Sequence, residues 1–306
     1  MKIVVFGANG LLGSSLVNNL SKDKNFKTFP STRNELDLLN GNKVKEFIHD
    51  IKPNVLINAA GKVGGILSNR NFKADFIIEN SLINLNIAEA LRSYTNVVNI
   101  AIGSSAMYSP NNKIPFEEHQ LFTGELDSSN RPYSISKLTN FEINKSLHSQ
   151  YGVNYLNLIP TNLYGQNDNF SETTSHVIPG LIYRFHNAKI QSNNEISIWG
   201  SGFPKREFLH VDDLAEACFV CMRDYNDPEP INVGTGTDVT IRELASSISN
   251  VVGFKGNMHW DADKPNGTPR KVLDVSKIKS LGWEPKISLE DGIRSTYEWY
   301  LDFVAR

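Results

Sequence analysis

Apolar and polar positions follow two different periods along the first half of the chain. The run Lys2–Phe6 is rich in β-branched residues and precedes a glycine, which predicts a strand and a tight turn. Leu11–Leu20 repeats apolar residues at helical spacing. The same patterns predict strands at residues 26–29, 53–58, 96–102 and 154–159, and helices at 42–50, 71–94 and 134–151. Strands that alternate with helices indicate an α/β fold, a doubly wound parallel sheet covered on both faces.

The alternation loosens from about Tyr164 onward, where Asn, Gly and Pro become frequent. This change predicts a smaller, irregular domain in the C-terminal half, with a boundary between Thr161 and Tyr164. A chain of 306 residues is long enough for two ordinary domains.

A glycine-rich segment, Gly7-Ala8-Asn9-Gly10-Leu11-Leu12-Gly13, joins the first strand to the first helix. In that context the first glycine permits the turn, the second admits a pyrophosphate and the third lets helix and strand pack closely. The helix N-terminus then faces the phosphates. The segment predicts a dinucleotide site, and the alternative is an ordinary glycine-rich turn.

The end of the second predicted strand indicates which dinucleotide binds. Enzymes that prefer NAD place a carboxylate there for the ribose 2′-OH, whereas an arginine accommodates a 2′-phosphate. This chain has Arg33 beside the hydroxyls of Ser31 and Thr32, and the first carboxylate is Glu35. Arg33 therefore favours NADPH over NADH, unless it is an ordinary surface arginine.

Tyr133 and Lys137 are four residues apart at the start of a predicted helix, so their side chains share one face. Reduction of a ketone needs a proton donor, and a lysine ammonium can bring a tyrosine pKa of about 10 toward neutrality. Ser104, at the end of the fourth predicted strand, can bind the carbonyl oxygen. Such a pair arises by chance in many sequences, but here it accompanies the glycine-rich turn.

Composition excludes several other functions. With 31 Lys and Arg against 33 Asp and Glu, the balance calls for no nucleic-acid or membrane partner, and no apolar run approaches the roughly 20 residues of a membrane span. Cys218 and Cys221 lie in a helical pattern without a second ligand pair, so packing is favoured over zinc or redox chemistry. Two cysteines and no leader before the first strand indicate a cytoplasmic protein. A Gly103-x-Ser105 fragment without a full nucleophile elbow argues against a hydrolase.

The chain resembles the GDP-L-fucose synthase family of the extended short-chain dehydrogenase/reductase superfamily nearly from end to end. The segments that carry the resemblance beyond those above are Asn58-Ala59-Ala60, Gly61-Lys62-Val63-Gly64-Gly65-Ile66, Gly103-Ser104-Ser105, Pro160-Thr161-Asn162-Leu163-Tyr164-Gly165, Ser175-His176-Val177-Ile178-Pro179, Trp199-Gly200-Ser201-Gly202, Arg206-Glu207-Phe208-Leu209-His210-Val211-Asp212-Asp213, Ile231-Asn232-Val233-Gly234-Thr235-Gly236 and Gly267-Thr268-Pro269-Arg270-Lys271.

The resemblance implies an NADPH-dependent enzyme that epimerises GDP-4-keto-6-deoxy-D-mannose at C3 and C5 and then reduces C4 to give GDP-L-fucose. It implies Ser104, Tyr133 and Lys137 as the reductive site and His176 as an acid in epimerisation. The implied cofactor contacts are Gly7, Ala8, Asn9, Gly10, Leu11, Leu12, Gly13, Arg33, Ala59, Ala60, Lys137, Pro160, Asn162, Leu163 and His176. The implied nucleotide-sugar contacts are Arg184, Trp199, Arg206 and Lys271. Each of these four also has an ordinary structural interpretation, as a core aromatic or a paired cation.

The resemblance also implies how the chain divides. Residues 1–163 would form the NADP-binding domain with a returning segment at about 206–236, and residues 164–205 and 237–306 the substrate-binding domain. The 71–94 and 134–151 helices are suited to pairing in a homodimer. No metal is expected.

Two positions depart from the family pattern. Ala106 stands where the family has a cysteine that removes the C3 and C5 protons, and alanine cannot accept a proton. We therefore expect impaired epimerisation, and the alternative function is reduction of a GDP-linked 4-keto-6-deoxy sugar alone. Asn266 replaces a frequent aspartate. A different class, a non-catalytic NADPH sensor, has no need of the Tyr133 proton donor.

Overall fold

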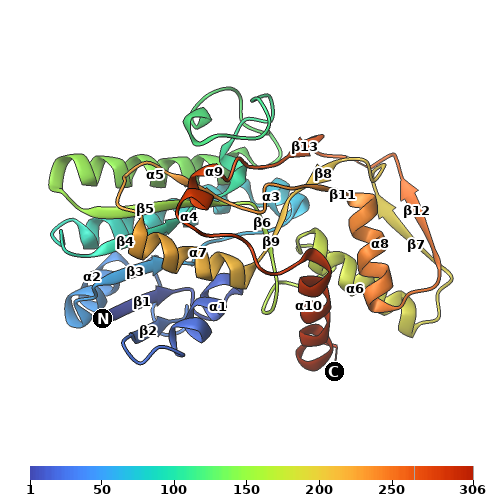
Figure 1. The fold of residues 1–306 in the computed structure, drawn as a ribbon, viewed down its shortest axis with the longest axis horizontal. Helices are drawn as coiled ribbons and strands as arrows, with labels where there is room; N and C mark the ends of the chain where they lie inside the picture. Colours follow the sequence, from blue (N-terminus) through green and yellow to red (C-terminus); the bar gives the residue numbers. More distant parts are fainter. Residues whose placement is uncertain (265, 306) are drawn as a thin grey trace.

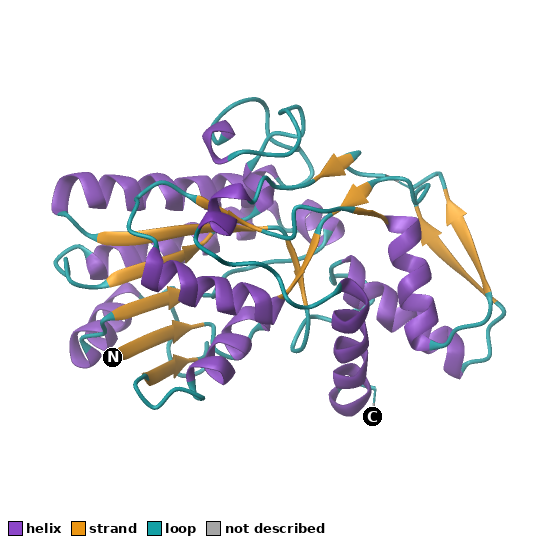
Figure 2. Ribbon diagram, in the orientation of Figure 1, coloured by secondary structure: helices purple, strands orange, loops and turns teal. Residues whose placement is uncertain are grey.

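A six-stranded parallel sheet forms the centre of the larger part of the molecule (Figures 1 and 2). The computed structural model describes residues 1–264 and 266–305. The sheet has the order β10-β5-β4-β3-β1-β2, and each neighbouring pair is parallel. Its strands are β1 (Lys2–Phe6), β2 (Lys27–Ser31), β3 (Val55–Asn58), β4 (Val98–Ile102), β5 (Asn154–Pro160) and β10 (Ile231–Val233).

Helices cover both faces of this sheet (Figure 1). On one face α1 (Leu11–Leu20) packs beside α7 (Val211–Asp224), and on the other α4 (Lys73–Leu91) packs between α2 (Gly41–Ile51) and α5 (Arg131–Tyr151). Alternate residues of β1 enter different apolar clusters: Ile3 and Val5 join that of α1 and α7, whereas Val4 and Phe6 join that of α2 and α4. The doubly wound parallel sheet is thus confirmed.

The strand order places a ligand crevice beside β1. Because β2 pairs with one edge of β1 and β3 with the other, the chain leaves β1 in one direction and later continues in the opposite one. In sheets of this kind ligands bind outside the carboxyl ends of the strands at that reversal. The glycine-rich turn follows β1 and Asn58-Ala59-Ala60 ends β3, so both lie at this edge.

A second part of the molecule lies beyond this edge (Figure 1). Its helices α6 (Val177–Ile190), α8 (Ile241–Val252) and α10 (Leu289–Phe303) share an apolar cluster, to which β7 (Glu195–Trp199), paired with β12 (Asn257–Asp261), contributes Ile198. Strand β8 (Lys205–Arg206) lies between β11 (Val239–Thr240) and β13 (Arg270–Lys271). The smaller elements are α3 (Ile66–Asn71), η1 (Ser105–Met107), η2 (Glu118–Gln120), β6 (Asn162–Tyr164), β9 (Phe208–His210) and α9 (Ser276–Ser280). The expectation of an irregular C-terminal half was wrong, because amphipathic helices form much of it.

Several predicted elements have bounds that differ from the structure, among them a helix and an edge strand. The helix expected at 71–94 is broken at Phe72, whose φ of −120° and ψ of 39° lie outside the helical region, so α3 and α4 are separate. The second strand runs on to Ser31 through Pro30, which an edge strand tolerates because Pro lacks only a donor. The carbonyl oxygen of Ser31 accepts hydrogen bonds from the amides of Gly7 and Ala8 and so ties this strand to the glycine-rich turn.

The apolar clusters do not follow one cut in the sequence. Leu209, Val211 and Val233 pack in the cluster of the large sheet, and so do Leu273, Ile278 and Trp283 from late in the chain. The predicted division at residue 163 stays a prediction. Cys218 and Cys221 are free and fully buried in α7, which confirms their packing role. Among the described residues no helix is long and apolar enough to cross a membrane.

Candidate active site

The glycine-rich turn is shaped by close backbone contacts that only glycine permits. Gly7 has a φ of +74°, and a Cβ there would lie 2.8 Å from the Ala60 nitrogen. A Cβ on Gly13 would lie 2.0 Å from the Gly7 carbonyl oxygen. Gly10 is the N-cap of α1 and offers no side-chain acceptor to the backbone N–H groups of the first helical turn. The result is a cradle of backbone N–H groups at a helix N-terminus, which suits a pyrophosphate.

The other predicted cofactor residues lie along the same edge. The Ala59 amide donates to the Phe6 carbonyl and the Ala60 amide to Asn58 Oδ1 at 3.1 Å, which fixes these alanines against the glycine-rich turn. Pro160 ends β5, and Asn162 and Leu163 follow in β6. The structure therefore gathers three segments that are far apart in the sequence at one edge of the sheet.

Arg33 is exposed just beyond the end of β2. The nearby carboxylate of Glu35 accepts hydrogen bonds from the Thr32 amide at 2.9 Å and from the Thr32 hydroxyl at 2.8 Å. These hydrogen bonds, and the one from the backbone amide most of all, lower the pKa of Glu35. A carboxylate tied into its own turn is poorly placed to bind a ribose hydroxyl. Arg33 is consequently the charged group of this turn that is available to a 2′-phosphate.

Tyr133 and Lys137 both lie in the first two turns of α5 and face the end of β4. Lys137 Nζ is 5.8 Å from the centre of the Tyr133 ring and donates to the Ile102 carbonyl at 2.8 Å. Ser104, two residues beyond Ile102, is a hydrogen-bond partner of the Tyr133 hydroxyl. Phe76 of α4 packs edge-on against the tyrosine ring at 6.2 Å. The three residues predicted to carry the reduction thus converge.

Burial sets the proton affinities of this pair. It raises the pKa of Tyr133 to about 12, opposed by the hydrogen bond with Ser104, and it lowers the pKa of Lys137 to about 8. The expectation that Lys137 would bring the pKa of Tyr133 toward neutrality is not met, because burial is the dominant influence on this pKa and raises it. A high pKa keeps Tyr133 protonated, which is the form a proton donor requires.

Ala106 lies in η1, two residues beyond Ser104, and its side chain is buried. Its amide donates to Ser104 Oγ at 3.2 Å, and its carbonyl accepts from Ser134 Oγ at 2.8 Å. Tyr108, a nearby candidate for the missing base, donates its hydroxyl to Asn232 Oδ1 at 2.7 Å and is fully buried. Burial raises the pKa of Tyr108 far above its usual value, so it is no proton acceptor.

His176 precedes α6 and lies next to the segment Gly61–Ile66. The Gly65 amide donates to the Thr174 carbonyl at 3.1 Å, and a Cβ on Gly65 would lie 2.5 Å from the Ser175 carbonyl oxygen. The His176 side chain is exposed to solvent at its edge, and desolvation by the surrounding protein lowers the pKa of His176. His176 therefore presents a neutral imidazole at pH 7.

Arg206 and Lys271 form a pair of cations at the other end of the crevice. The strands β8 and β13 are parallel with Lys271 in register with Arg206, so the two side chains are cross-strand neighbours. Burial lowers the pKa of both, and Arg206 lowers that of Lys271 further. Like charges held together in this way are stabilised by an anion that spans them.

Asp127, which sequence reasoning did not identify, lies beside this pair. Burial by itself would raise its pKa, but hydrogen bonds from Ser129 and Thr268 and the charge of Lys271 bring the pKa below its usual value. Thr268 Oγ1 donates to Asp127 Oδ2 at 2.9 Å across 141 residues of sequence. No local signal could identify such a contact, because it forms only when the loop before α5 folds onto the loop before β13.

Arg184 and Trp199 are placed differently. Arg184 of α6 is partly buried and donates to the Ser197 carbonyl, so one of its nitrogens serves the structure. Trp199 ends β7 with 47% of its surface exposed and Lys264 Nζ 5.9 Å from its ring centre. Asn266 accepts from the amide and hydroxyl of Ser201 at 2.7 and 2.9 Å, so its side chain holds the loop that follows Trp199.

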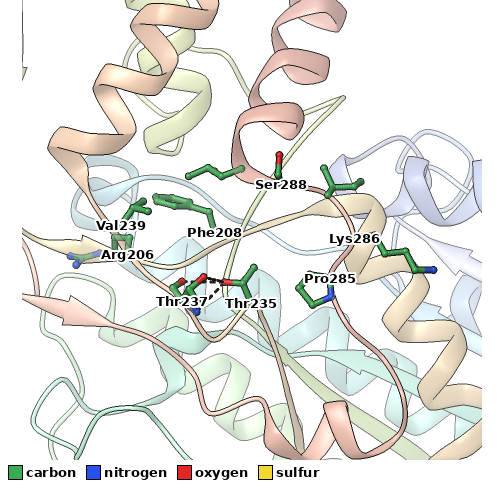
Figure 3. Close-up of a pocket in the computed structure, with 10 residues that line it drawn as sticks. Arg206, Phe208, Thr235, Thr237, Val239, Pro285, Lys286 and Ser288 are labelled. Carbon is green, nitrogen blue, oxygen red and sulfur yellow. Dashed lines mark hydrogen bonds between the residues drawn. The ribbon is translucent and has the colours of Figure 1, made fainter.

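A cavity of about 390 Å³ adjoins Arg206 but lies away from Tyr133. Figure 3 shows Phe208, Thr235, Pro285 and Ser288 around it, with Arg206 at its edge. Of the predicted site residues only Arg206 lines it.

Comparison with known proteins places these residues in a family. Residues 3–234 match the NAD dependent epimerase/dehydratase family. The chain is 43% identical to the GDP-L-fucose synthase of Escherichia coli (strain K12), covering 98% of this chain and 97% of that protein, and 44% identical to GDP-L-fucose synthase 1 of Arabidopsis thaliana, covering 98% and 93%. The solved structure of the GDP-mannoheptose C4 reductase from Campylobacter jejuni with NADP bound is 35% identical with a TM-score of 0.89, covering 98% of both chains. The chain therefore belongs to the GDP-L-fucose synthase family of the extended short-chain dehydrogenase/reductase superfamily and is an NADPH-dependent oxidoreductase.

Proposed function

We propose that this enzyme converts GDP-4-keto-6-deoxy-D-mannose to GDP-L-fucose by epimerisation at C3 and C5 and reduction at C4. The observation that carries the proposal is the convergence of Tyr133, Lys137 and Ser104 on one point of the crevice, with the Arg206–Lys271 pair available for a diphosphate. The full-length relatives named GDP-L-fucose synthase support the same substrate.

The residues at the carboxyl edge fit NADPH. The Gly7–Gly13 turn forms a cradle that a Cβ would fill, α1 begins without a side-chain cap, and Arg33 lies where a 2′-phosphate is recognised. Ala59, Ala60, Pro160, Asn162, Leu163 and His176 complete the proposed binding surface. Bound NADPH supplies the hydride for C4 reduction.

In the reductive step the chain supplies a proton and orients the ketone. Tyr133, protonated because its pKa is about 12, donates the proton to the C4 oxygen, and Ser104 holds that oxygen beside it. The pKa of Lys137 is about 8, so its ammonium is charged at pH 7 and offsets the negative charge that the Tyr133 oxygen acquires. Arg206 and Lys271 neutralise the diphosphate, and Trp199 and Arg184 bind the nucleotide sugar.

Epimerisation requires a base, and the buried methyl group of Ala106 supplies none. The family resemblance gives His176 the role of the acid that returns a proton to these carbons, and Tyr108 cannot act as the base because its hydroxyl is bound to Asn232. The alternative function, C4 reduction alone, is favoured by this one observation. A sensor without chemistry is not supported, because the chain belongs to an enzyme family and retains the proton donor.

Deuterium uptake separates the two functions. The enzyme, NADPH and GDP-4-keto-6-deoxy-D-mannose are incubated in deuterated water, and the product sugar is analysed by NMR. The full conversion predicts deuterium at C3 and C5 and GDP-L-fucose as product, with uptake lost in H176N and accelerated in A106C. A reduced 6-deoxyhexose without deuterium at either carbon would exclude the full conversion and establish the alternative.

We also propose a cytoplasmic homodimer. Ile78, Leu82 and Leu85 of α4 are 55%, 41% and 48% exposed and follow one another at helical spacing, so they form an apolar stripe beside α5. A second copy of the chain would cover this stripe. Two free, buried cysteines suit a reducing compartment.

We propose that residues 1–163 and about 206–236 form the NADP-binding domain and that residues 164–205 and 237–306 form the substrate-binding domain. Two observations support it: β10 lies in the large sheet, whereas α6, α8 and α10 share a separate cluster.

A further inference from the structure

Glu207 is a buried carboxylate that the proposed chemistry does not use. It follows Arg206 at the end of β8, precedes β9 and has no exposed surface. Because successive side chains of an extended segment point in opposite directions, Glu207 points away from the crevice that Arg206 faces. It therefore does not contact a substrate bound between Arg206 and Lys271.

The carboxylate joins two distant segments of the chain to Glu207, and backbone hydrogen bonds with Phe116 also hold the residues on either side of Leu273. Oε1 accepts the Gly236 amide at 2.7 Å, and Oε2 accepts the Leu273 amide at 2.9 Å. Leu273 lies two residues beyond Lys271, and β8 and β13 pair over only two residues each. The Glu207 side chain thus continues the attachment of β13 just beyond the register that brings Lys271 beside Arg206.

Such an attachment is needed because the two cations repel. Arg206 and Lys271 are cross-strand neighbours, and the Arg206 charge helps to lower the pKa of Lys271, while the nearby Asp127 carboxylate acts in the opposite direction on both cations. Two-residue strands resist this repulsion poorly, whereas hydrogen bonds from backbone amides to a carboxylate are charge-assisted and stronger than neutral ones.

The surrounding sequence accommodates this carboxylate. A Cβ on Gly234 would lie 2.2 Å from Glu207 Oε1, so glycine at this position leaves room for it. Thr235 Oγ1 also lies 3.4 Å from Oε1, which joins the loop at the cavity of Figure 3 to the same carboxylate. The Glu207 backbone, by contrast, accepts from Asn162 Nδ2 at 2.8 Å and Thr161 Oγ1 at 3.1 Å, contacts that do not depend on the side chain.

We infer that Glu207 is a positioning residue that holds the Arg206–Lys271 pair in the spacing at which it binds the diphosphate of the nucleotide sugar. The inference rests on the proposed function for the identity of that ligand. The side chain acts on the diphosphate end of the crevice, whereas the backbone carbonyl serves the cofactor side through Asn162. Loss of the carboxylate should therefore weaken GDP and leave NADPH binding unchanged.

The test is E207Q, whose amide accepts only one of the two backbone N–H groups and turns an NH₂ toward the other. Isothermal titration with GDP should show a dissociation constant raised about ten- to hundredfold, as for the loss of a hydrogen bond to a charged group. NADPH affinity, followed by its fluorescence, should change less than twofold. In steady-state assays KM for the nucleotide sugar should rise more than kcat falls.

The matched control is D213N. Asp213 is also buried and accepts two backbone amides, those of Lys286 at 3.0 Å and Ile287 at 3.1 Å, neither of which belongs to β8 or β13. Its loss should lower the melting temperature without changing GDP affinity. If E207Q does not fold, G234A gives the same test, because its Cβ displaces the carboxylate while keeping the charge.

A double-mutant cycle tests whether the effect of E207Q on GDP binding acts through Lys271. In a K271A background E207Q should cause no further loss of GDP affinity, because the residue it positions is already gone. Independent, additive losses, or equal weakening of GDP and NADPH, would overturn the inference. If wild type and E207Q bind GDP with equal affinity, the inference about Glu207 is wrong but the proposed function stands. If the wild type binds no GDP, both the proposed function and this inference are wrong.

Discussion

Removal of the catalytic charge at Lys137 should make the protein more stable while it abolishes efficient reduction. Burial lowers the pKa of Lys137 from 10.5 to about 8, so the folded state holds an ammonium that it disfavours. A shift of this size corresponds to about 3 kcal/mol at pH 7 before allowance for partial exposure. Lys137→Met also loses the bond to the Ile102 carbonyl at 2.8 Å, worth about 1 kcal/mol. We expect a net gain of about 1–2 kcal/mol.

The pH dependence gives the sharper result. Below pH 8 Lys137 is protonated in both the folded and the unfolded state, and the whole penalty applies. Between the folded pKa of about 8 and the unfolded value of 10.5 the unfolded state binds more protons, so the stability of the wild type rises with pH. The advantage of Lys137→Met should therefore shrink from pH 7 to pH 10 and reverse once the lost hydrogen bond dominates.

Urea denaturation at pH 7 and pH 10 measures both effects. The control is Lys145→Met, which removes an exposed lysine from the same helix and should leave the pH dependence of the wild type unchanged. A Lys137→Met variant that differs from the wild type by the same free energy at both pH values would refute the argument, because the burial penalty would then be absent.

Three further predictions follow from the site. Tyr133→Phe should lower kcat by about 10²–10⁴-fold with NADPH affinity retained, because only the proton donor is removed; full turnover in this variant would require another acid. Arg33→Ala should weaken NADPH about ten- to hundredfold and NADH little, measured by fluorescence titration; equal weakening would show that Arg33 does not contact the 2′-phosphate. Leu82→Glu should convert a dimer to a monomer in light scattering after size-exclusion chromatography, since a charge replaces the centre of the apolar stripe on α4; an unchanged mass would place the interface elsewhere.

Local sequence patterns determined much of the first half of the molecule. The alternation of strands and helices, the glycine turn after β1 and the spacing of Tyr133 and Lys137 all depend on residues close together in the chain. Each has a period or a steric requirement that sequence displays directly, such as the positive φ of Gly7. The convergence of Ser104 with Tyr133 also followed, because the carboxyl ends of parallel strands share one edge.

The tertiary structure alone decided the features that depend on distant partners. The register of Lys271 with Arg206 and the bonds of Glu207 to Gly236 and Leu273 join segments 29 to 66 residues apart. Tyr108 turns from the site to Asn232, 124 residues away. The pKa of Tyr133 likewise depends on desolvation by the folded protein, which a residue's neighbours in sequence do not reveal. Periodicity is a local property, whereas burial and hydrogen bonds between loops exist only once the chain has closed upon itself.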